Sequence, residues 1–292
     1  MFTFRKIAFL AVLAFIAVAA RAQQGFSEDF TLWNIGEQDS RYVFADTAYI
    51  RSAPSVSQAP LDTLIAGDEL KIHSIVKQPF SLKGFTARWL SVSYTKGGVQ
   101  KSGYIWEGLV SFTPLRRGVT KFVYGLNRMV DSVSGQGSEV YTNKVYHIGL
   151  KVVTGNTIVA ATTLRVIADE SASFTDASVT AGEGLDGVSN LVKLTFSGEA
   201  CGIPTRHYYY AWTGKDLLPL PVLTDEVDAG AYFYEEQFVF LAHKDGKPGL
   251  ILLKVHEGED TGKVNKKGEP VFIEKKKTVK YQWDGRAAAK LK

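Results

Sequence analysis

Cysteine, methionine and long apolar runs are all scarce in this chain of 292 residues. Cys201 is the only cysteine, so no disulfide can form within the chain and its stability must come from core burial. After residue 20, no stretch is apolar enough to span a bilayer. The sequence also lacks His-x-x-x-His or paired-cysteine spacings, a Gly-x-Ser-x-Gly elbow and a glycine-rich phosphate loop. These absences remove the commonest sequence signs of zinc, hydrolase and nucleotide sites.

The first 22 residues have the three-part pattern of a secretory signal. Arg5 and Lys6 precede an apolar run over residues 7–20, and Ala20-Arg21-Ala22 supplies the small residues that a signal peptidase reads. The run is shorter than the ~20 residues of a spanning helix, and no cysteine marks the cleavage point for a lipid anchor. We therefore expect an exported protein, periplasmic or extracellular at the cell surface, with no membrane span once residues 1–22 are removed.

Removal of the signal also changes the net charge. Residues 1–22 hold three basic side chains and no acid, so the formal charge of +4 falls to about +1. A nearly neutral chain argues against a nucleic-acid partner. One cationic cluster lies near the C-terminus, and it indicates either a solvated hairpin or a contact with an anionic polymer or lipid head groups. Its members are Lys263, Lys266, Lys267, Lys275, Lys276, Lys277 and Lys280.

Short apolar runs that alternate with turn residues predict an all-β chain. Strand-type runs such as 146–152, 157–160 and 250–255 are bounded by turns that contain Gly or Asp, and Thr154-Gly155-Asn156 is typical of a hairpin. Pro114 and the polar residues after it indicate a domain boundary. The predicted order is a signal at 1–22, a lead-in at 23–40, a small domain at 41–113, a linker at 114–119 and a larger β domain at 120–292.

Four ordered fragments of the small domain resemble the bacterial SH3-like (SH3b) family. They are Ala48-Tyr49-Ile50-Arg51-Ser52-Ala53-Pro54-Ser55, Leu64 to Ile72, Trp89-Leu90-Ser91-Val92 and Gly103-Tyr104-Ile105-Trp106. The resemblance implies a small barrel of about five short strands, while the segment 77–88 is longer than the family's usual loop. It also implies binding of peptides or cell-wall components through an aromatic groove. The residues that would form this groove are Tyr49, Phe80, Phe85, Tyr104 and Trp106.

The larger domain carries a weak internal repeat. Its two copies share a Tyr-x-Trp-x-Gly core, at 210–214 and 281–285, and each follows a turn and an apolar strand. The unit faintly resembles degenerate FG-GAP-type β repeats, whose turns bind calcium. Asp245 is the only acid left in the corresponding turn, and calcium needs six to eight oxygen ligands, so we expect no metal and no cofactor. The expected architecture is an antiparallel open sheet stack, a sandwich or a partial propeller.

The search for catalytic residues favours a protein that is not an enzyme. Cys201 lies between two strand-like runs beside Gly202 and Pro204, not at the helix start typical of a cysteine peptidase, although His207 is near in sequence. A group of acids could supply a glycosidase pair but is better explained as a solvated loop. These acids are Asp225, Glu226, Asp228, Glu235 and Glu236.

We therefore predict an exported envelope protein whose SH3-like domain binds wall peptide, wall glycan (peptidoglycan) or a partner protein. The alternative is a cell-wall hydrolase, or an accessory of one, with an unrecognised catalytic β domain.

Overall fold

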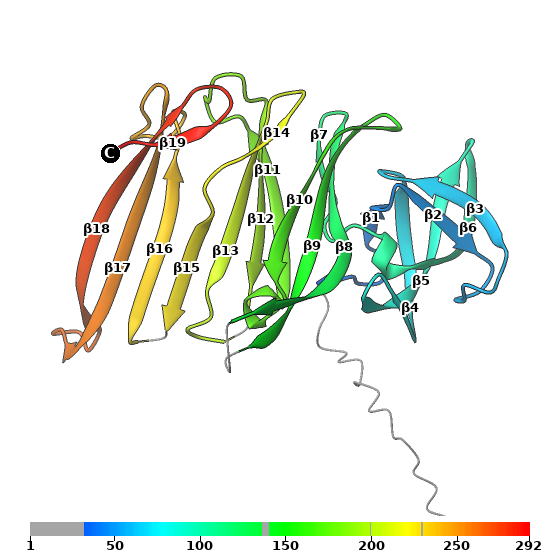
Figure 1. Cartoon of the computed structure of the whole chain (residues 1–292), viewed down its shortest axis with the longest axis horizontal. Helices are drawn as coiled ribbons and strands as arrows, with labels where there is room; N and C mark the ends of the chain where they lie inside the picture. Colours follow the sequence, from blue (N-terminus) through cyan, green and yellow to red (C-terminus); the bar gives the residue numbers. More distant parts are fainter. Residues whose placement is uncertain (1–31, 136–139, 199, 229) are drawn as a thin grey trace, which may run out of the picture.

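The computed structural model describes residues 32–135, 140–198, 200–228 and 230–292. Within these ranges the only helical segments are two short 3-10 turns, η1 (Glu107–Leu109) and η2 (Glu170–Ala172). The strands form three antiparallel sheets, arranged from the barrel at one end of the molecule to the C-terminus at the other (Figure 1). The predicted all-β class is confirmed. The predicted signal at 1–22 lies outside the described residues.

The first sheet curls into a small barrel (Figure 1) with strand order β1-β4-β5-β6-β2-β3. Its side chains alternate between core and solvent, as in β2, where Ala48 and Ile50 are buried and Tyr49 is exposed. Gly67, with φ +87°, lies in the turn between β3 and β4, a backbone conformation that favours glycine. The strands are β1 (Ser40–Tyr42), β2 (Thr47–Arg51), β3 (Pro60–Ile65), β4 (Glu69–Leu82), β5 (Phe85–Lys96) and β6 (Val99–Trp106).

The second sheet begins inside the segment predicted as a linker. β7 (Leu115–Arg117) pairs with β8 (Thr120–Ser134), which is followed in the sheet by β9 (Tyr141–Thr154) and β10 (Thr157–Ile167). Gly155, with φ +60°, turns the predicted hairpin between β9 and β10. Residues 114–119 therefore belong to a hairpin of this sheet, and the chain leaves the barrel directly into the next sheet.

The barrel is docked on one face of the second sheet. Phe44 lies so close to Gly125 that an added Cβ there would be 2.7 Å from the ring. The buried ammonium of Lys151 donates to the Phe44 carbonyl and to Asp46 Oδ1, both at 2.7 Å. The same ammonium lies 4.3 Å from the centroid of the Phe44 ring. This contact fixes the barrel to β8 and β9.

The third sheet packs on the other face of the second sheet. Its order is β11-β12-β13-β15-β16-β17-β18-β19, with β14 paired to β13. Tyr124 on β8 and Phe196 on β12 are fully buried members of one apolar core that also includes the barrel. The strands are β11 (Phe174–Ala181), β12 (Asn190–Ser197), β13 (Thr205–Trp212), β14 (Leu217–Pro219), β15 (Leu223–Asp228), β16 (Tyr232–Val239), β17 (Leu250–Val264), β18 (Pro270–Trp283) and β19 (Ala288–Lys290).

The third sheet extends past the second sheet and curls around a smaller core of its own. Leu185, Phe238, Ile251 and Trp283 are among its buried members. Trp283 Nε1 donates to the Asp186 carbonyl at 2.9 Å, which ties β18 to the loop before β12.

The predicted repeat is visible as two equivalent hairpins. In each copy the Tyr-x-Trp strand pairs with a three-residue strand, as Trp212↔Leu217 in the first copy and Trp283↔Ala288 in the second. The glycine of each copy has a positive φ, +90° at Gly214 and +86° at Gly285. The shared sequence core therefore encodes one local fold, used twice in the same sheet.

Candidate functional site

The aromatic residues predicted to form a groove on the barrel are only partly at its surface. Phe85 and Trp106 are 6% and 2% exposed, and their rings stack with centroids 5.0 Å apart. Phe80 is half-buried and its ring meets Trp106 edge-on at 6.0 Å. Trp106 Nε1 donates to the Phe80 and Ala87 carbonyls at 3.0 and 3.2 Å. The expectation of an exposed platform is therefore corrected for Phe85 and Trp106, which are core residues.

Phe85 and Trp106 are buried because of the conformation of the segment 77–88. It is not a loop, because β4 and β5 continue through it and turn at Lys83 and Gly84, where φ is +57° and +85°. The extended hairpin carries its aromatic rings inward. Trp89 at the end of this segment is also a core residue, 2% exposed.

A smaller aromatic surface remains on the outside of the barrel. Tyr49 is 48% exposed, and the Arg51 guanidinium lies 5.8 Å from the centroid of its ring. Arg51 is directly opposite Tyr104 on β6. The three side chains share one face, because positions two apart on a strand and directly paired positions point the same way. A ligand-binding role for Tyr49 and Tyr104 stays a prediction.

Cys201 and His207 lie in different environments. Cys201 is exposed in the loop before β13. His207 is buried, and its ring nitrogens are engaged by Thr195 Oγ1 at 2.9 Å and Asp225 Oδ2 at 2.8 Å. Burial would raise the pKa of Asp225, but the hydrogen bonds from His207 and from the Glu236 amide together lower it. The Thr195–His207–Asp225 chain thus ties β12, β13 and β15 together where the third sheet begins to curl.

The acids that the sequence grouped do not act as one cluster. Asp225 faces His207, while Glu236 lines a cavity on the curled face and Glu235 lines a separate hollow. Glu236 Oε1 accepts from the Tyr234 hydroxyl at 2.6 Å, and its Oε2 accepts from the Thr224 amide at 2.8 Å. Both oxygens of this carboxylate are therefore occupied within the protein. The hydrolase alternative stays a prediction.

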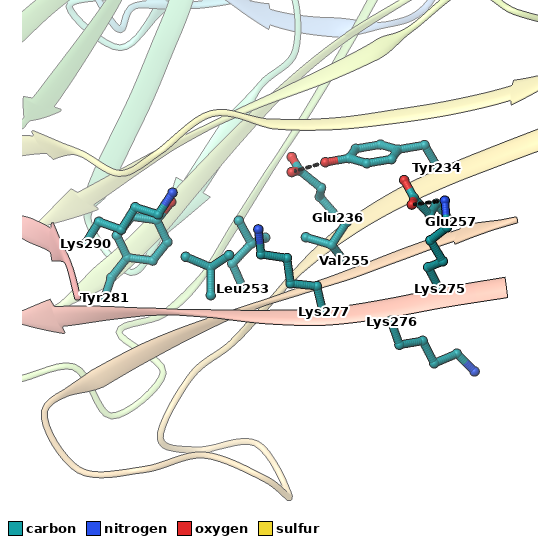
Figure 2. A pocket seen from close by; sticks show the side chains of 11 residues that line it. Tyr234, Glu236, Leu253, Val255, Glu257, Lys275, Lys276, Lys277, Tyr281 and Lys290 are labelled. Carbon is teal, nitrogen blue, oxygen red and sulfur yellow. Dashed lines mark hydrogen bonds and ion pairs between the residues drawn. The ribbon is translucent and has the colours of Figure 1, made fainter. Parts of the chain in front are cut away.

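The most complete candidate site is this cavity, which we call the curl pocket (Figure 2). Its volume is about 710 Å³, within the ~300–1,000 Å³ typical of small-molecule sites. It lies over β16, β17, β18 and β19, next to the core of the curl. Its lining residues are Tyr234, Glu236, Leu253, Val255, Glu257, Lys275, Lys276, Lys277, Val279, Tyr281 and Lys290.

Strand register places the lining residues in rows across the curl. Leu253 is paired with Val279, Val255 with Lys277 and Glu257 with Lys275, so the floor changes from apolar to charged along β17 and β18. Tyr281 is paired with Lys290 at the β19 side. Burial and the neighbouring Glu236 raise the pKa of Tyr281, and burial together with the Glu236 hydrogen bond raises that of Tyr234. Both phenols therefore stay neutral hydrogen-bonding groups at physiological pH.

Four lysines of the cluster, Lys275, Lys276, Lys277 and Lys280, are on β18, where strand alternation divides them between the two faces. Figure 2 shows Lys275 and Lys277 on the side of the pocket, whereas Lys276 points away from it. Lys275 Nζ lies 3.5 Å from Glu257 Oε1, and Lys276 Nζ lies 3.3 Å from Glu274 Oε2 on the outer face. The sequence signal for this arrangement is the alternation over 275–281, which puts two lysines, Val279 and Tyr281 on one face.

Within the described ranges, no three His, Cys, Asp or Glu side chains are grouped closely enough to hold a metal ion. In the turn compared with calcium-binding repeats, Asp245 Oδ2 accepts from Lys254 Nζ at 2.5 Å. A search of the same ranges for helices that could cross a membrane also found none that is sufficiently long and apolar.

Comparisons of the chain with protein-family models, with curated proteins and with solved structures gave no match.

Proposed function

We propose that this chain is a non-enzymatic binding protein, exported to the cell envelope, that holds a ligand in the curl pocket. The observation that carries the proposal is the pocket itself, a cavity of about 710 Å³ whose lining combines an apolar floor with two tyrosines and six charged side chains. Its volume is within the ~300–1,000 Å³ of small-molecule sites, and its charged lining favours a ligand that also carries charge. Export is supported by the signal pattern of residues 1–22.

The lining chemistry favours binding over catalysis. The carboxylate of Glu236 is held by Tyr234 and the Thr224 amide, and that of Glu257 is paired with Lys275. A general base must be within reach of a proton on the substrate. Because both carboxylates of the pocket already have partners within the protein, they are better suited to shaping the pocket than to taking a proton from a substrate.

The test is to purify the protein from the envelope fraction of its native cells and measure its mass under native conditions. We expect a bound small molecule on the wild type and its loss from Val255→Trp, which fills the floor of the pocket. Val227→Trp, at a site that is 53% exposed and outside the pocket, is the matched control and should keep the ligand. A wild type without bound ligand, or equal loading of both variants, contradicts the proposal.

A second candidate function concerns the barrel, where one observation favours it. Tyr49, Arg51 and Tyr104 share an outer face, and two aromatic rings beside a guanidinium suit a peptide or a glycan. We propose this face as the contact of an SH3-like module with wall peptide, wall glycan or a partner protein. Retention on purified peptidoglycan should fall for Tyr49→Ala/Tyr104→Ala and persist for Tyr141→Ala, an exposed tyrosine of the second sheet. No retention of the wild type would exclude the wall as the ligand.

A further inference from the structure

We infer that the ligand of the curl pocket is an anionic amphiphile, a molecule with an acidic head group and an apolar tail. The inference rests on the proposed binding function and adds the chemical class of the ligand. It draws on the unbalanced charge of the pocket and on the apolar floor beside that charge.

The charge of the pocket is not balanced from within. Both of its acids have partners, Glu236 through hydrogen bonds and Glu257 through Lys275. Lys277 and Lys290 also line the pocket, and the ammonium group of neither has a hydrogen-bond or ion-pair partner among the residues that the structure describes. Two ammonium groups are thus left for an anion supplied from outside.

On the outer face of the same strands, two lysines form ion pairs with acids. Lys254 pairs with Asp245 at 2.5 Å, and Lys276 pairs with Glu274 at 3.3 Å. Glu274 also meets His256 Nε2 at 2.9 Å. Lys254 and Lys276 therefore each have an acid within ion-pair distance, whereas Lys277 and Lys290 on the pocket side have none among the described residues.

The position of these lysines sets the orientation of the ligand. Lys277 on β18 is paired with Val255, and Lys290 on β19 is paired with Tyr281, so each lysine is next to an apolar or aromatic residue of the floor. The opposite wall is acidic, since Glu236 and Glu257 come from β16 and β17. An anion is attracted to the β18–β19 side and repelled from the other.

The apolar floor of the pocket is the reason to expect an apolar tail on the ligand. Leu253 is a buried member of the core of the curl, and Val255, Val279 and Tyr281 pack against that core while lining the pocket. When an apolar ligand covers apolar surface of the pocket, that surface is removed from water and the free energy of the complex is lowered. A purely polar anion would satisfy Lys277 and Lys290 but leave this floor in water.

The experiment uses the mature protein and two fluorescent probes that differ in one charge, dansyl-undecanoic acid and its methyl ester. We expect the acid to bind roughly tenfold more tightly than the ester, since two exposed ion pairs each contribute a few-fold. Lys277→Ala and Lys290→Ala should each weaken binding of the acid about threefold and leave the ester unchanged. Added salt should reduce the difference in affinity between the acid and the ester.

Two controls separate charge from fold. Lys254→Ala removes a lysine from the neighbouring strand β17 that does not line the pocket and is paired with Asp245, and it should bind both probes as the wild type does. Lys277→Arg keeps the charge and should restore the preference for the acid. Palmitate and vesicles of phosphatidylglycerol are then compared as competitors, which distinguishes a free fatty acid from an acidic membrane lipid as the source.

Each unfavourable result would contradict a different part of the proposal. Equal binding of acid and ester, unaffected by the lysine variants but lost in Val255→Trp, overturns the anionic assignment and leaves the pocket as a binding site. Binding of neither probe overturns the amphiphile, and the proposed function then depends on the ligand found by native mass measurement. Weakening by Lys254→Ala equal to that by Lys277→Ala would show general charge attraction and also overturn the inference.

Discussion

Removal of the Phe44 side chain should destabilise the barrel together with the two sheets that share its core. Phe44 is 1% exposed and packs against Gly125 and under the Lys151 ammonium. Large-to-small replacement of a buried phenylalanine costs about 3–5 kcal/mol, and the lost contact between the ammonium and the ring adds about 0.5–2 kcal/mol. The sum is a large part of the ~5–15 kcal/mol that stabilises a typical domain.

The assay is urea unfolding followed by two probes. Tryptophan fluorescence reports mainly on the barrel region, which contains three of the five tryptophans, and a fluorophore on the exposed Cys201 reports on the third sheet. For Phe44→Ala we expect both probes to move together, to a midpoint lower by about 1–2 M urea. Val56→Ala, at a residue that is 49% exposed in the barrel, should shift the midpoint hardly at all.

A tryptophan transition that moves while the Cys201 transition stays in place would refute this reasoning. It would mean that the barrel unfolds alone and that its contact with β8 and β9 adds little. An independently folding barrel would also strengthen the view of it as a separate binding module.

Three further substitutions test single interactions. Glu107 is 1% exposed and its carboxylate binds the Arg88 guanidinium, so Glu107→Ala should cost about 3–5 kcal/mol in urea unfolding. Hydrogen bonds lower the pKa of Asp225 in the fold, so its contribution is present above the unfolded pKa and lost as acid protonates it; Asp225→Asn and wild-type stabilities should differ at neutral pH and converge in acid. Burial raises the pKa of Tyr124 to about 12, so stability should fall as pH rises above the unfolded value near 10, and Tyr124→Phe should flatten that alkaline limb, as followed by tyrosinate absorbance and unfolding.

Local sequence patterns predicted strands well because alternation and turn chemistry act over short distances. The hairpin at Thr154-Gly155-Asn156 and the two Tyr-x-Trp-x-Gly hairpins are formed as the residues indicated. The barrel aromatics were harder to place, because Phe85 and Trp106 have the same local pattern whether a ring points into a core or into a groove. Only the hairpin of β4 and β5, which folds the segment 77–88 onto the barrel, decides between the two.

The curl pocket could not be predicted, because it depends on pairing across the chain. The sequence showed a run of lysines at 275–277 but not that Val255 and Glu257 lie opposite two of them. It grouped Asp225 with Glu236 because they are near in sequence; in the fold the Asp225 carboxylate accepts from the Glu236 amide and meets His207, while the Glu236 carboxylate accepts from Tyr234 and the Thr224 amide. Alternation alone separates Lys276 from its neighbours, and this is the part of the site that sequence reasoning could have found.

The fold does not require lysine at the positions of β18 and β19 that face the pocket. Lys277 is paired with Val255 next to the apolar core of the curl, where an apolar side chain would pack at least as well. Lysine on an open edge strand can also serve to block unwanted strand pairing, and Lys276 with its partner Glu274 is suited to that role. Lys277 faces the pocket instead and has no acid beside it in the described part of the chain. Lys277→Leu should therefore keep or raise stability while removing the preference for an anion, which would separate the requirements of the fold from those of the ligand.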